Sequence, residues 1–368
     1  MISMAPPFVL RLSKDEWRVF QRNQMIKSLI TGGAGYFGEL LARKLLERGY
    51  FVRILDIHRP AQEFPGTEMV QVDIRDADAV MSACKGMDVV FHNAAELAMR
   101  TNIALLWDVN RDGTRKLLES CVRRGVQKVI YTSSSAVYGV PLSNPVTEQT
   151  VPTPVEEYGK AKLAGETLCW DYARRGLDVS IVRPCPIVGH GRLGLFQILF
   201  EWIYQGKNIP VLNDGRNIFQ FVHADDLAEA CIRASMAKGG DAFNCGTDRF
   251  GTMRQVLEHI CRHAGTGSQV KSLPMRPFVT AMKLSSALGI SPLGAYHASM
   301  YGRPFYFDIS KARSKLGWDP CYSNEEMFVE SYEWYLANRN MVLIAADSAS
   351  RHRSAVEQGA LKLLHWFL

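Results

Sequence analysis

The chain has 368 residues, of which 47% are hydrophobic and 22% are charged, a composition typical of a globular protein with a sizeable core. It carries 43 Lys and Arg against 37 Asp and Glu, but the two signs are interspersed, so we expect no nucleic-acid partner. No apolar run reaches the roughly 18 residues of a membrane span, and no signal peptide is evident. The eight scattered cysteines form no C-x-x-C pair, which indicates a reducing, cytoplasmic location and no metal site.

Residues 1–24 precede the first predicted strand and are expected to form an extension. A short apolar run at 25–30 predicts a buried strand, and a glycine-rich turn leads from it into a helix at 37–49 that ends at Gly49. Further strands are expected at 51–56, 69–73, 88–95, 126–135 and 177–184, and further helices at 75–86, 105–125 and 158–176. Because apolar strands alternate with helices, we expect a parallel sheet covered on both faces.

The predicted fold class is therefore α/β, a Rossmann-type doubly wound parallel sheet with a smaller, mainly C-terminal substrate-binding cap. The sheet domain is expected at 25–184 with a return segment at about 217–248, the cap at 185–216 and 249–337, and a tail at 338–368. Two apolar segments, 273–300 and 360–368, are expected to be a lid or packed helices. Contact with a membrane surface or a partner subunit is the alternative for both.

The turn after the first strand reads TGGAGYFG, with glycines at Gly32, Gly35 and Gly38 and an extra Gly33. Glycines there allow a tight turn and a close approach of the backbone to a pyrophosphate, while the following helix directs its N-terminal N–H groups at that anion. Asp56 ends the next strand, where a carboxylate binds the adenosine ribose 2′-OH and repels a 2′-phosphate. The pattern predicts a dinucleotide site that prefers NAD to NADP.

Four other residues are considered for this site. His58 and Arg59 lie close enough to Asp56 to weaken the preference for NAD. Asp73, after the third strand, is expected to accept a hydrogen bond from the adenine amino group. For His92, at the end of the fourth strand, we favour a packed structural role over a catalytic one.

Tyr158 and Lys162 are four residues apart in a helical pattern and therefore share one face. A Tyr has a pKa near 10, but a nearby ammonium favours the phenolate, which can take a hydroxyl proton while a nicotinamide takes the hydride. Ser133, Ser134 and Ser135 end the fifth strand, where sheet ligands bind. One of these hydroxyls is expected to orient the substrate oxygen.

Residues 25–337 resemble the extended short-chain dehydrogenase/reductase superfamily, in its NAD-dependent epimerase/dehydratase branch. The matching motifs are TGGAGYFG, VDIRD, HNAA, VNRDGT, YTSSSAVYG, YGKAK, VRP, FVHADDLAEA and FDISKARSKLGWDP. The resemblance implies an NAD-dependent enzyme with Ser134 as the catalytic hydroxyl, Tyr158 as the acid/base and Lys162 as its partner. It also implies a homodimer whose interface includes the helix of Tyr158. Further cofactor-binding positions that it implies are Tyr36, Phe37, Ile74, Ala94, Ala95, Asn110 and Pro184.

The resemblance is weaker where a substrate would bind. Members that act on nucleotide sugars usually have an Asn where this chain has Pro186, and an Arg-Asp pair where it has Phe219 and Gln220. Arginines elsewhere could bind a substrate anion instead. The candidate substrate contacts are Ser135, Arg192, Arg216 and Arg303.

Three functions follow from these residues. The leading one is a sugar or nucleotide-sugar enzyme of the 4-epimerase kind, in which hydride passes transiently to NAD. Dehydration is its weakest variant, because Ser135 and Ala136 follow Ser134 where dehydratases often carry Asp-Glu. The second is a net NAD-dependent dehydrogenase of a sterol-like or secondary-metabolite hydroxyl. The third is a non-catalytic NAD-binding scaffold, against which the intact Ser134, Tyr158 and Lys162 argue.

Overall fold

The computed structural model describes residues 25–60, 65–96, 102–275, 280, 300 and 302–344. The expected N-terminal extension, most of the apolar segment 273–300 and the segment 360–368 lie outside the described residues.

A seven-stranded sheet forms the centre of the protein, and all of its neighbouring strands are parallel. The strand order is β11-β6-β5-β4-β1-β2-β3. The strands are β1 (Lys27–Thr31), β2 (Phe51–Asp56), β3 (Thr67–Gln71), β4 (Val89–His92), β5 (Lys128–Thr132), β6 (Asp178–Pro184) and β11 (Ala242–Cys245). The predicted Rossmann-like α/β fold is confirmed, and the segment expected to return to the sheet supplies its last strand, β11.

Helices cover both faces of the sheet because successive strand residues point to opposite sides. In β1, Leu29 packs into one core with α3 (Ala77–Ala83), α5 (Thr114–Arg124) and α6 (Glu157–Arg174). Its neighbour Ile30 packs into the other core with α2 (Tyr36–Glu47) and α8 (Ala224–Met236). Apolar residues at every strand position therefore reflect burial on both faces.

The chain changes direction between β1 and β4. From β1 it continues outward to β2 and β3, and it then returns to build β4, β5 and β6 on the other side. The connections that leave the carboxyl ends of β1 and β4 therefore lead in opposite directions along the sheet. Open α/β sheets bind their ligands at such a point.

The helix predicted at 105–125 is interrupted. It begins as α4 (Ile103–Trp107), widens into the π-helical segment η1 (Asp108–Gly113), and continues as α5. In η1 the Asn110 side chain accepts a hydrogen bond from the Glu96 N–H at 2.8 Å and donates to the Glu96 carbonyl at 2.9 Å. These two bonds hold the widened turn against the loop after β4. Single π-helical turns are frequent at functional sites.

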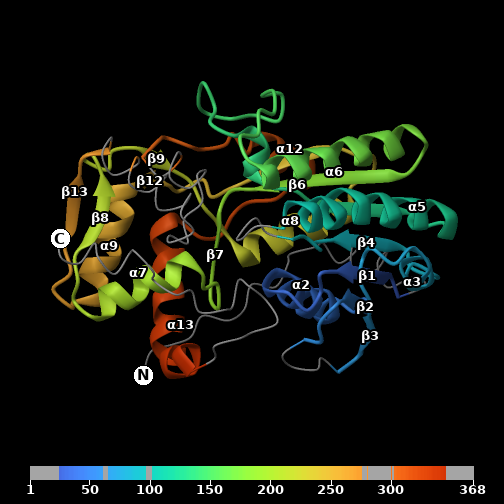
Figure 1. Cartoon of the computed structure of the whole chain (residues 1–368), viewed down its shortest axis with the longest axis horizontal. Helices are drawn as coiled ribbons and strands as arrows, with labels where there is room; N and C mark the ends of the chain where they lie inside the picture. The colour runs from blue at the N-terminus through green and yellow to red at the C-terminus, as the bar shows by residue number, and fades with distance from the viewer. Residues whose placement is uncertain are drawn as a thin grey trace.

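A second group of elements lies beside the sheet domain, at the left in Figure 1. It contains α7 (Leu195–Tyr204), α9 (Met253–Ala264) and the parallel pair β8 (Ile209–Leu212) and β13 (Val270–Leu273). Two short pairs join this group to the sheet domain: β7 (Ile187–Val188) with β10 (Val222–His223), and β9 (Ile218–Phe219) with β12 (Gly251–Thr252). One apolar core runs through both parts.

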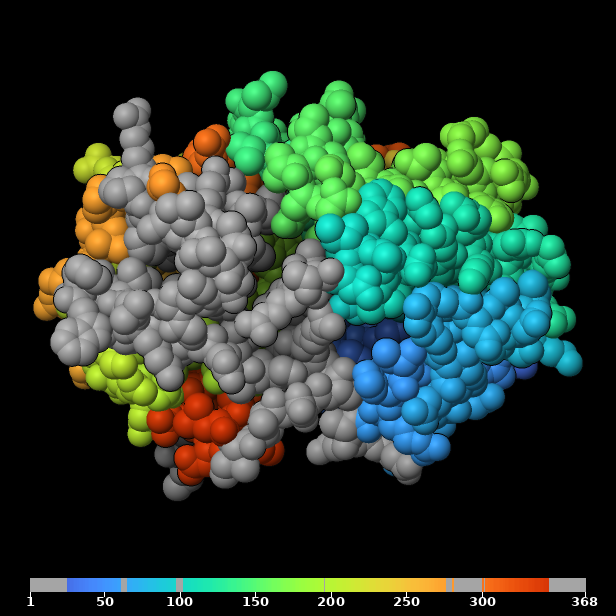
Figure 2. Space-filling view, viewed as in Figure 1, coloured from blue at the N-terminus to red at the C-terminus, as the bar shows by residue number. Residues whose placement is uncertain are grey.

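The last two helices are α12 (Ser310–Leu316) and α13 (Asn324–Ile344). The latter, drawn in red, reaches the surface at the lower left of Figure 2. It continues past residue 338, where the expected tail begins. There the Nε and Nη2 atoms of Arg339 donate to Glu201 of α7 at 2.8 and 2.7 Å. Among the described residues no helix is long and apolar enough to cross a membrane.

Candidate active site

The glycine turn between β1 and α2 lies at the switch point. Gly32 has a left-handed φ of 68°, and a Cβ on it would lie 2.7 Å from the Ala94 nitrogen. The turns after β1 and β4 are therefore in contact. A Cβ on Gly38 would lie only 2.1 Å from the Gly32 carbonyl oxygen, whereas one on Gly35 would lie 3.2 Å from it. Gly32 and Gly38 are thus needed to form the turn itself.

We expect Gly38→Ala to lower the free energy of unfolding by about 1–3 kcal/mol, because a methyl group must displace the backbone of the turn. Gly35→Ala is the matched control, since Gly35 has an extended backbone with φ −77° and ψ 168°; it should stay within about 0.5 kcal/mol. Urea unfolding of the NAD-free protein measures both. Equal losses for the two variants would contradict this account of the turn.

Asp56 faces the turn from the end of β2. Its carboxylate accepts hydrogen bonds from the Ala34 N–H at 3.1 Å and the His58 N–H at 3.0 Å. Asp73, the predicted adenine contact, accepts hydrogen bonds from Arg75 on both of its oxygens at 2.7 to 3.0 Å. These hydrogen bonds lower the pKa of Asp73, so any adenine contact would have to compete with a guanidinium.

His92 is buried and neutral. Its ring bonds to the hydroxyls of Thr31 at 2.7 Å and Thr114 at 2.8 Å, and Thr114 donates onward to the Asn110 carbonyl. Burial, together with the charge of Lys162, lowers the pKa of His92 to about 3. Its geometry is that of a packing residue that links β1 and β4 to η1.

Ser134 and Tyr158 come together across the end of β5. Ser134 caps the short helix η2 (Ser135–Tyr138) by accepting from the Ala136 N–H at 3.1 Å. Tyr158 lies in the first turn of α6, and a Cβ on the next residue, Gly159, would lie 2.5 Å from the Ala136 carbonyl. This close approach brings the two segments together, and Ser134 lies near enough to the Tyr158 hydroxyl to lower its pKa.

Two charged groups act on the Tyr158 hydroxyl in opposite directions. Burial raises the pKa of Tyr158 to about 12, against the lowering effects of Ser134 and of the Arg192 guanidinium, and Glu156 raises it further. Glu156 itself has a pKa raised to about 7 by burial. The sequence analysis missed this carboxyl, although it stands two residues before Tyr158 at the N-cap of α6.

Lys162 lies one turn beyond Tyr158 and is buried. Its ammonium donates to the Thr132 carbonyl at 2.9 Å and stands 5.0 Å from the centre of the Tyr131 ring. Burial lowers its pKa to about 8. In the ligand-free protein the Lys162 ammonium therefore donates to the backbone of β5, and it loses its proton at a lower pH than an exposed lysine does.

This depressed pKa predicts a pH-dependent stability. The unfolded chain holds the Lys162 proton up to about pH 10.4, whereas the folded chain releases it near pH 8. Between those values the unfolded state binds more protons, so stability should rise with pH by up to about 1.4 kcal/mol per unit. Lys162→Met should remove that rise. Urea unfolding of both proteins at pH 7, 8.5 and 9.5 measures it, and parallel pH profiles would contradict it.

A buried ion pair links the segments that carry the site residues. Arg183 of β6 donates to Glu166 of α6 at 2.6 and 2.8 Å and to the Tyr138 hydroxyl at 2.7 Å. Glu166 also accepts from Ser133 at 2.5 Å, and Tyr138 donates to Asn244 at 2.8 Å. These residues stand in the motifs YGKAKLAGE, VRP and SSAVYG, yet sequence reasoning gave them no role because their pairing is visible only once the strands are aligned.

The candidate substrate residues are distributed unequally. Ser135 is buried at the start of η2 beside Ser134. Arg192 is half-buried near Tyr158. Arg303 is exposed, and Arg216 is exposed and paired with Asp214 at 3.0 Å. Only Ser135 and Arg192 thus lie beside the residues that form the site.

The remaining cofactor-binding candidates line the carboxyl edge of the sheet. Tyr36 and Phe37 open α2, Ala94 and Ala95 follow β4, and Pro184 ends β6. Ile74 follows β3 and approaches Gly113, since a Cβ there would lie 2.8 Å from its side chain.

A cluster of histidines connects α13 to the sheet domain. Glu330 bonds His223 at 2.5 Å and His190 at 3.3 Å, and burial of Glu330 is outweighed by these bonds, which lower its pKa to about 2. His190, His223 and Asp225 together have the side chains of a metal site. Among the described residues these side chains already have protein partners, since both histidines bond Glu330 and Asp225 pairs with Lys44 at 2.6 Å.

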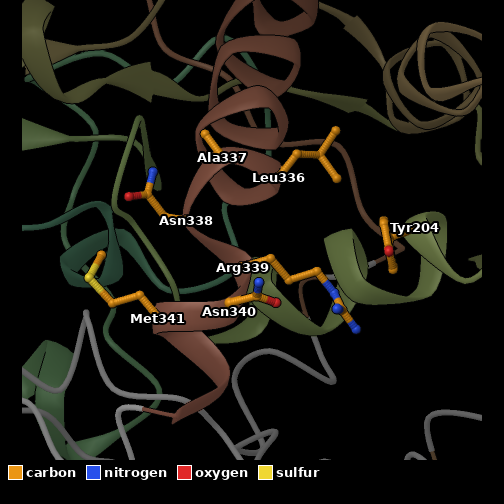
Figure 3. Close-up of a pocket in the computed structure, with 7 residues that line it drawn as sticks. All are labelled: Tyr204, Leu336, Ala337, Asn338, Arg339, Asn340 and Met341. Atoms are coloured by element: carbon orange, nitrogen blue, oxygen red, sulfur yellow. The ribbon is translucent and has the colours of Figure 1, made fainter.

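A surface pocket of about 480 Å³ lies between Tyr204 and residues 336–341, as Figure 3 shows. Arg339 points across it toward Tyr204, with its guanidinium 4.2 Å from the ring centre. The same guanidinium is already neutralised by Glu201. None of the lining residues belongs to the glycine turn or to the Ser134–Tyr158 pair, so we assign this pocket no part in the site.

A glycine turn at the switch point and a tyrosine with a serine close to its hydroxyl are features of a dinucleotide-dependent oxidoreductase. A family model described as the NAD dependent epimerase/dehydratase family matches residues 28–246. The chain therefore belongs to this family, and the predicted family, catalytic nature and NAD cofactor are confirmed.

Three relatives and one solved structure show the breadth of the likeness. An uncharacterized protein (y4nG) of Sinorhizobium fredii is 51% identical over 93% of this chain and 86% of its own length. A UDP-glucose 4-epimerase of Mycolicibacterium smegmatis is 29% identical over 84% and 98%. A 3 beta-hydroxysteroid dehydrogenase/Delta 5-->4-isomerase of Mycobacterium tuberculosis is 28% identical over 84% and 90%. The structure of a UDP-glucose 4-epimerase from Thermotoga maritima with UDP-glucose is 25% identical with a TM-score of 0.72, covering 85% and 100%.

Proposed function

We propose that this enzyme epimerises a sugar or nucleotide sugar: it oxidises a secondary hydroxyl and then reduces the ketone on its other face. The observation that carries the proposal is that Ser134 lies beside the Tyr158 hydroxyl and lowers its pKa, with Lys162 one turn further along α6, at the edge of the sheet where the glycine turn lies. The likeness to two UDP-glucose 4-epimerases supports the substrate class.

In the first step the substrate hydroxyl loses its proton and its carbon loses a hydride. Bound NAD supplies the hydride acceptor. The glycine turn and Asp56 fit its diphosphate and ribose, because Gly32 and Gly35 are partly exposed and have no side chain at the N-terminus of α2. The Tyr158 oxygen takes the proton, and Ser134 positions the substrate oxygen. In the second step Tyr158 returns the proton to the reduced oxygen.

The Tyr158 proton transfer requires a lower pKa than about 12. Positive charge supplies that shift, since a cation near a phenol favours the phenolate. Arg192 acts on Tyr158 in this direction. We propose that Lys162, one turn further along α6, adds to that effect and binds the nicotinamide ribose. We propose the same cofactor-binding and catalytic residues that the sequence predicts.

The first experiment is to purify the protein without added cofactor, denature it and quantify the released NAD and NADH. An epimerase recycles its hydride, so near-stoichiometric cofactor is expected. A panel of nucleotide sugars, followed by chromatography of the products, then identifies the substrate. Turnover of none of them would refute the proposal.

A net dehydrogenase of an apolar alcohol is the second candidate. Gln220, at the position of the usual Asp, is fully buried, donating to the Thr247 carbonyl and accepting from the Phe307 N–H at 2.7 Å. Phe219, at the position of the usual diphosphate-binding Arg, packs against Phe221 and Phe305. Neither can bind a diphosphate. An empty protein that reduces external NAD stoichiometrically with a hydroxylated apolar substrate would favour this candidate.

We further propose a cytoplasmic homodimer that uses α5 and α6, which pack against each other. Light scattering on the eluted protein measures its mass, and a monomer would contradict the proposal. A non-catalytic scaffold is the remaining alternative, and it would gain support only if Tyr158→Phe left the cellular role intact.

A further inference from the structure

Arg192 lies in the loop between β7 and α7, where its N–H donates to the Gly189 carbonyl at 3.0 Å. Its guanidinium carbon stands 5.6 Å from the centre of the Tyr36 ring, and Tyr36 is the first residue of α2. The guanidinium also acts electrostatically on the Tyr158 hydroxyl. Arg192 thus spans the space between the start of α2 and the proposed acid/base.

This cation lacks an anionic partner within the described residues. Its Nε is sealed from solvent and makes no hydrogen bond to them. Every other buried or half-buried arginine in the described part of the chain pairs with a carboxylate: Arg48, Arg53, Arg111, Arg183, Arg233, Arg254 and Arg339. Arg192 is therefore distinguished by its position beside the site and by the missing counter-charge.

Burial lowers the pKa of Arg192 to about 10, so that it is still charged at neutral pH. A half-buried charge without a partner is unfavourable. It becomes favourable when a ligand supplies two oxygens to the planar fork of the guanidinium. The neighbouring Tyr36 ring holds the fork in place by a cation–π contact.

We propose that Arg192 binds an anionic group of the bound ligand, a diphosphate or carboxylate oxygen pair, between the glycine turn and Tyr158. This inference rests on the proposed function. Two sources offer that chemistry: the diphosphate of NAD, and an acidic group on the substrate near the reacting hydroxyl. An apolar alcohol has no anionic group for Arg192 to bind. The site would therefore select its ligand by charge as well as by shape.

The test compares Arg192→Gln and Arg192→Lys with Arg313→Gln, a matched loss of charge at an exposed arginine of α12 that pairs with Asp248 and Asp319. Calorimetric titrations use NAD on the free protein, and UDP-glucuronate, UDP-glucose and pyrophosphate on the NAD-saturated protein. Arg192→Gln should weaken one anionic ligand by about 10- to 100-fold. Arg192→Lys should weaken it less, because the charge stays but the fork is lost.

The outcomes separate the sources. Weaker NAD binding assigns the contact to the cofactor diphosphate. Unchanged NAD binding with weaker binding of UDP-glucuronate, and not of UDP-glucose, assigns it to an acidic group on the substrate. Unchanged NAD binding with weaker binding of pyrophosphate and of both sugar nucleotides assigns it to a diphosphate of the substrate. Affinities within about twofold of the wild type for all four ligands would overturn the proposal. Failure of the wild type to bind either sugar nucleotide would count against the proposed function alone, since NAD and pyrophosphate still report on Arg192.

A folding control accompanies these titrations. No hydrogen bond to the Arg192 side chain exists within the described residues, so its replacement orphans no partner there. The ligand-free Arg192→Gln protein should keep its circular dichroism spectrum and melt at the same temperature or higher. A lower melting temperature together with weaker binding of every ligand would show a structural role and overturn the proposal.

Discussion

Tyr158→Phe should lower kcat by about 10²- to 10⁴-fold, the usual contribution of a positioned acid/base, while the affinity for NAD changes little. The substitution removes only the hydroxyl that Ser134 contacts. The ring stays in place in the first turn of α6, so the packing of Gly159 on the Ala136 carbonyl is kept. Steady-state rates on the identified substrate and a calorimetric titration with NAD measure the two quantities.

A matched control is Tyr204→Phe, which removes an equivalent hydroxyl from a half-exposed ring at the surface of α7 and should leave kcat unchanged. Ser134→Ala should give a smaller loss than Tyr158→Phe, because Tyr158 could still exchange its proton with the substrate directly. More than about a tenth of the wild-type rate in Tyr158→Phe would contradict an acid/base role. A rate loss matched by an equal loss of NAD affinity would indicate a defect in cofactor binding.

Glu166→Gln should lower the free energy of unfolding by about 3–5 kcal/mol, because it leaves the buried Arg183 guanidinium without its counter-charge. Glu166 and Arg183 are both buried, and they share two hydrogen bonds of 2.6 and 2.8 Å. The amide that replaces the carboxylate also loses its charge-assisted bond with Ser133. Urea unfolding at pH 7 measures the change.

Two controls separate this effect from a general loss of charge. Glu119→Gln breaks an exposed pair with Arg123 and should cost at most about 0.5 kcal/mol. The double variant Glu166→Gln, Arg183→Met removes the stranded cation, so it should be more stable than the sum of the two single changes. Additive losses would show that the pair is not coupled and that the cost of Glu166→Gln has another cause.

Much of the site was predictable because its signals are local. The alternation of apolar runs and helical patterns predicted six of the seven strands, and the seventh, β11, falls inside the predicted return segment. The four-residue spacing of Tyr158 and Lys162 placed them on one face of α6. The packed role favoured for His92 agrees with its two threonine hydroxyl bonds.

Other features depended on partners distant in the chain. Gly32, Gly35 and Gly38 are equivalent in the sequence, yet the fold leaves room for a Cβ only at Gly35. The bond of Arg75 to both oxygens of Asp73 was not visible in the sequence, because it depends on the backbone turn between the two residues.

The strands, the helices, the glycine turn and the shared helix face of Tyr158 and Lys162 were all predictable, because each depends on residues a few positions apart. The compensation of the charges was not predictable and follows from the fold. Arg183 meets Glu166, Glu330 meets two histidines more than a hundred residues away, and Arg192 meets no carboxylate among the described residues. Burial and pairing of charge depend on which elements pack together across the fold, and that packing sets the energetics on which this site relies.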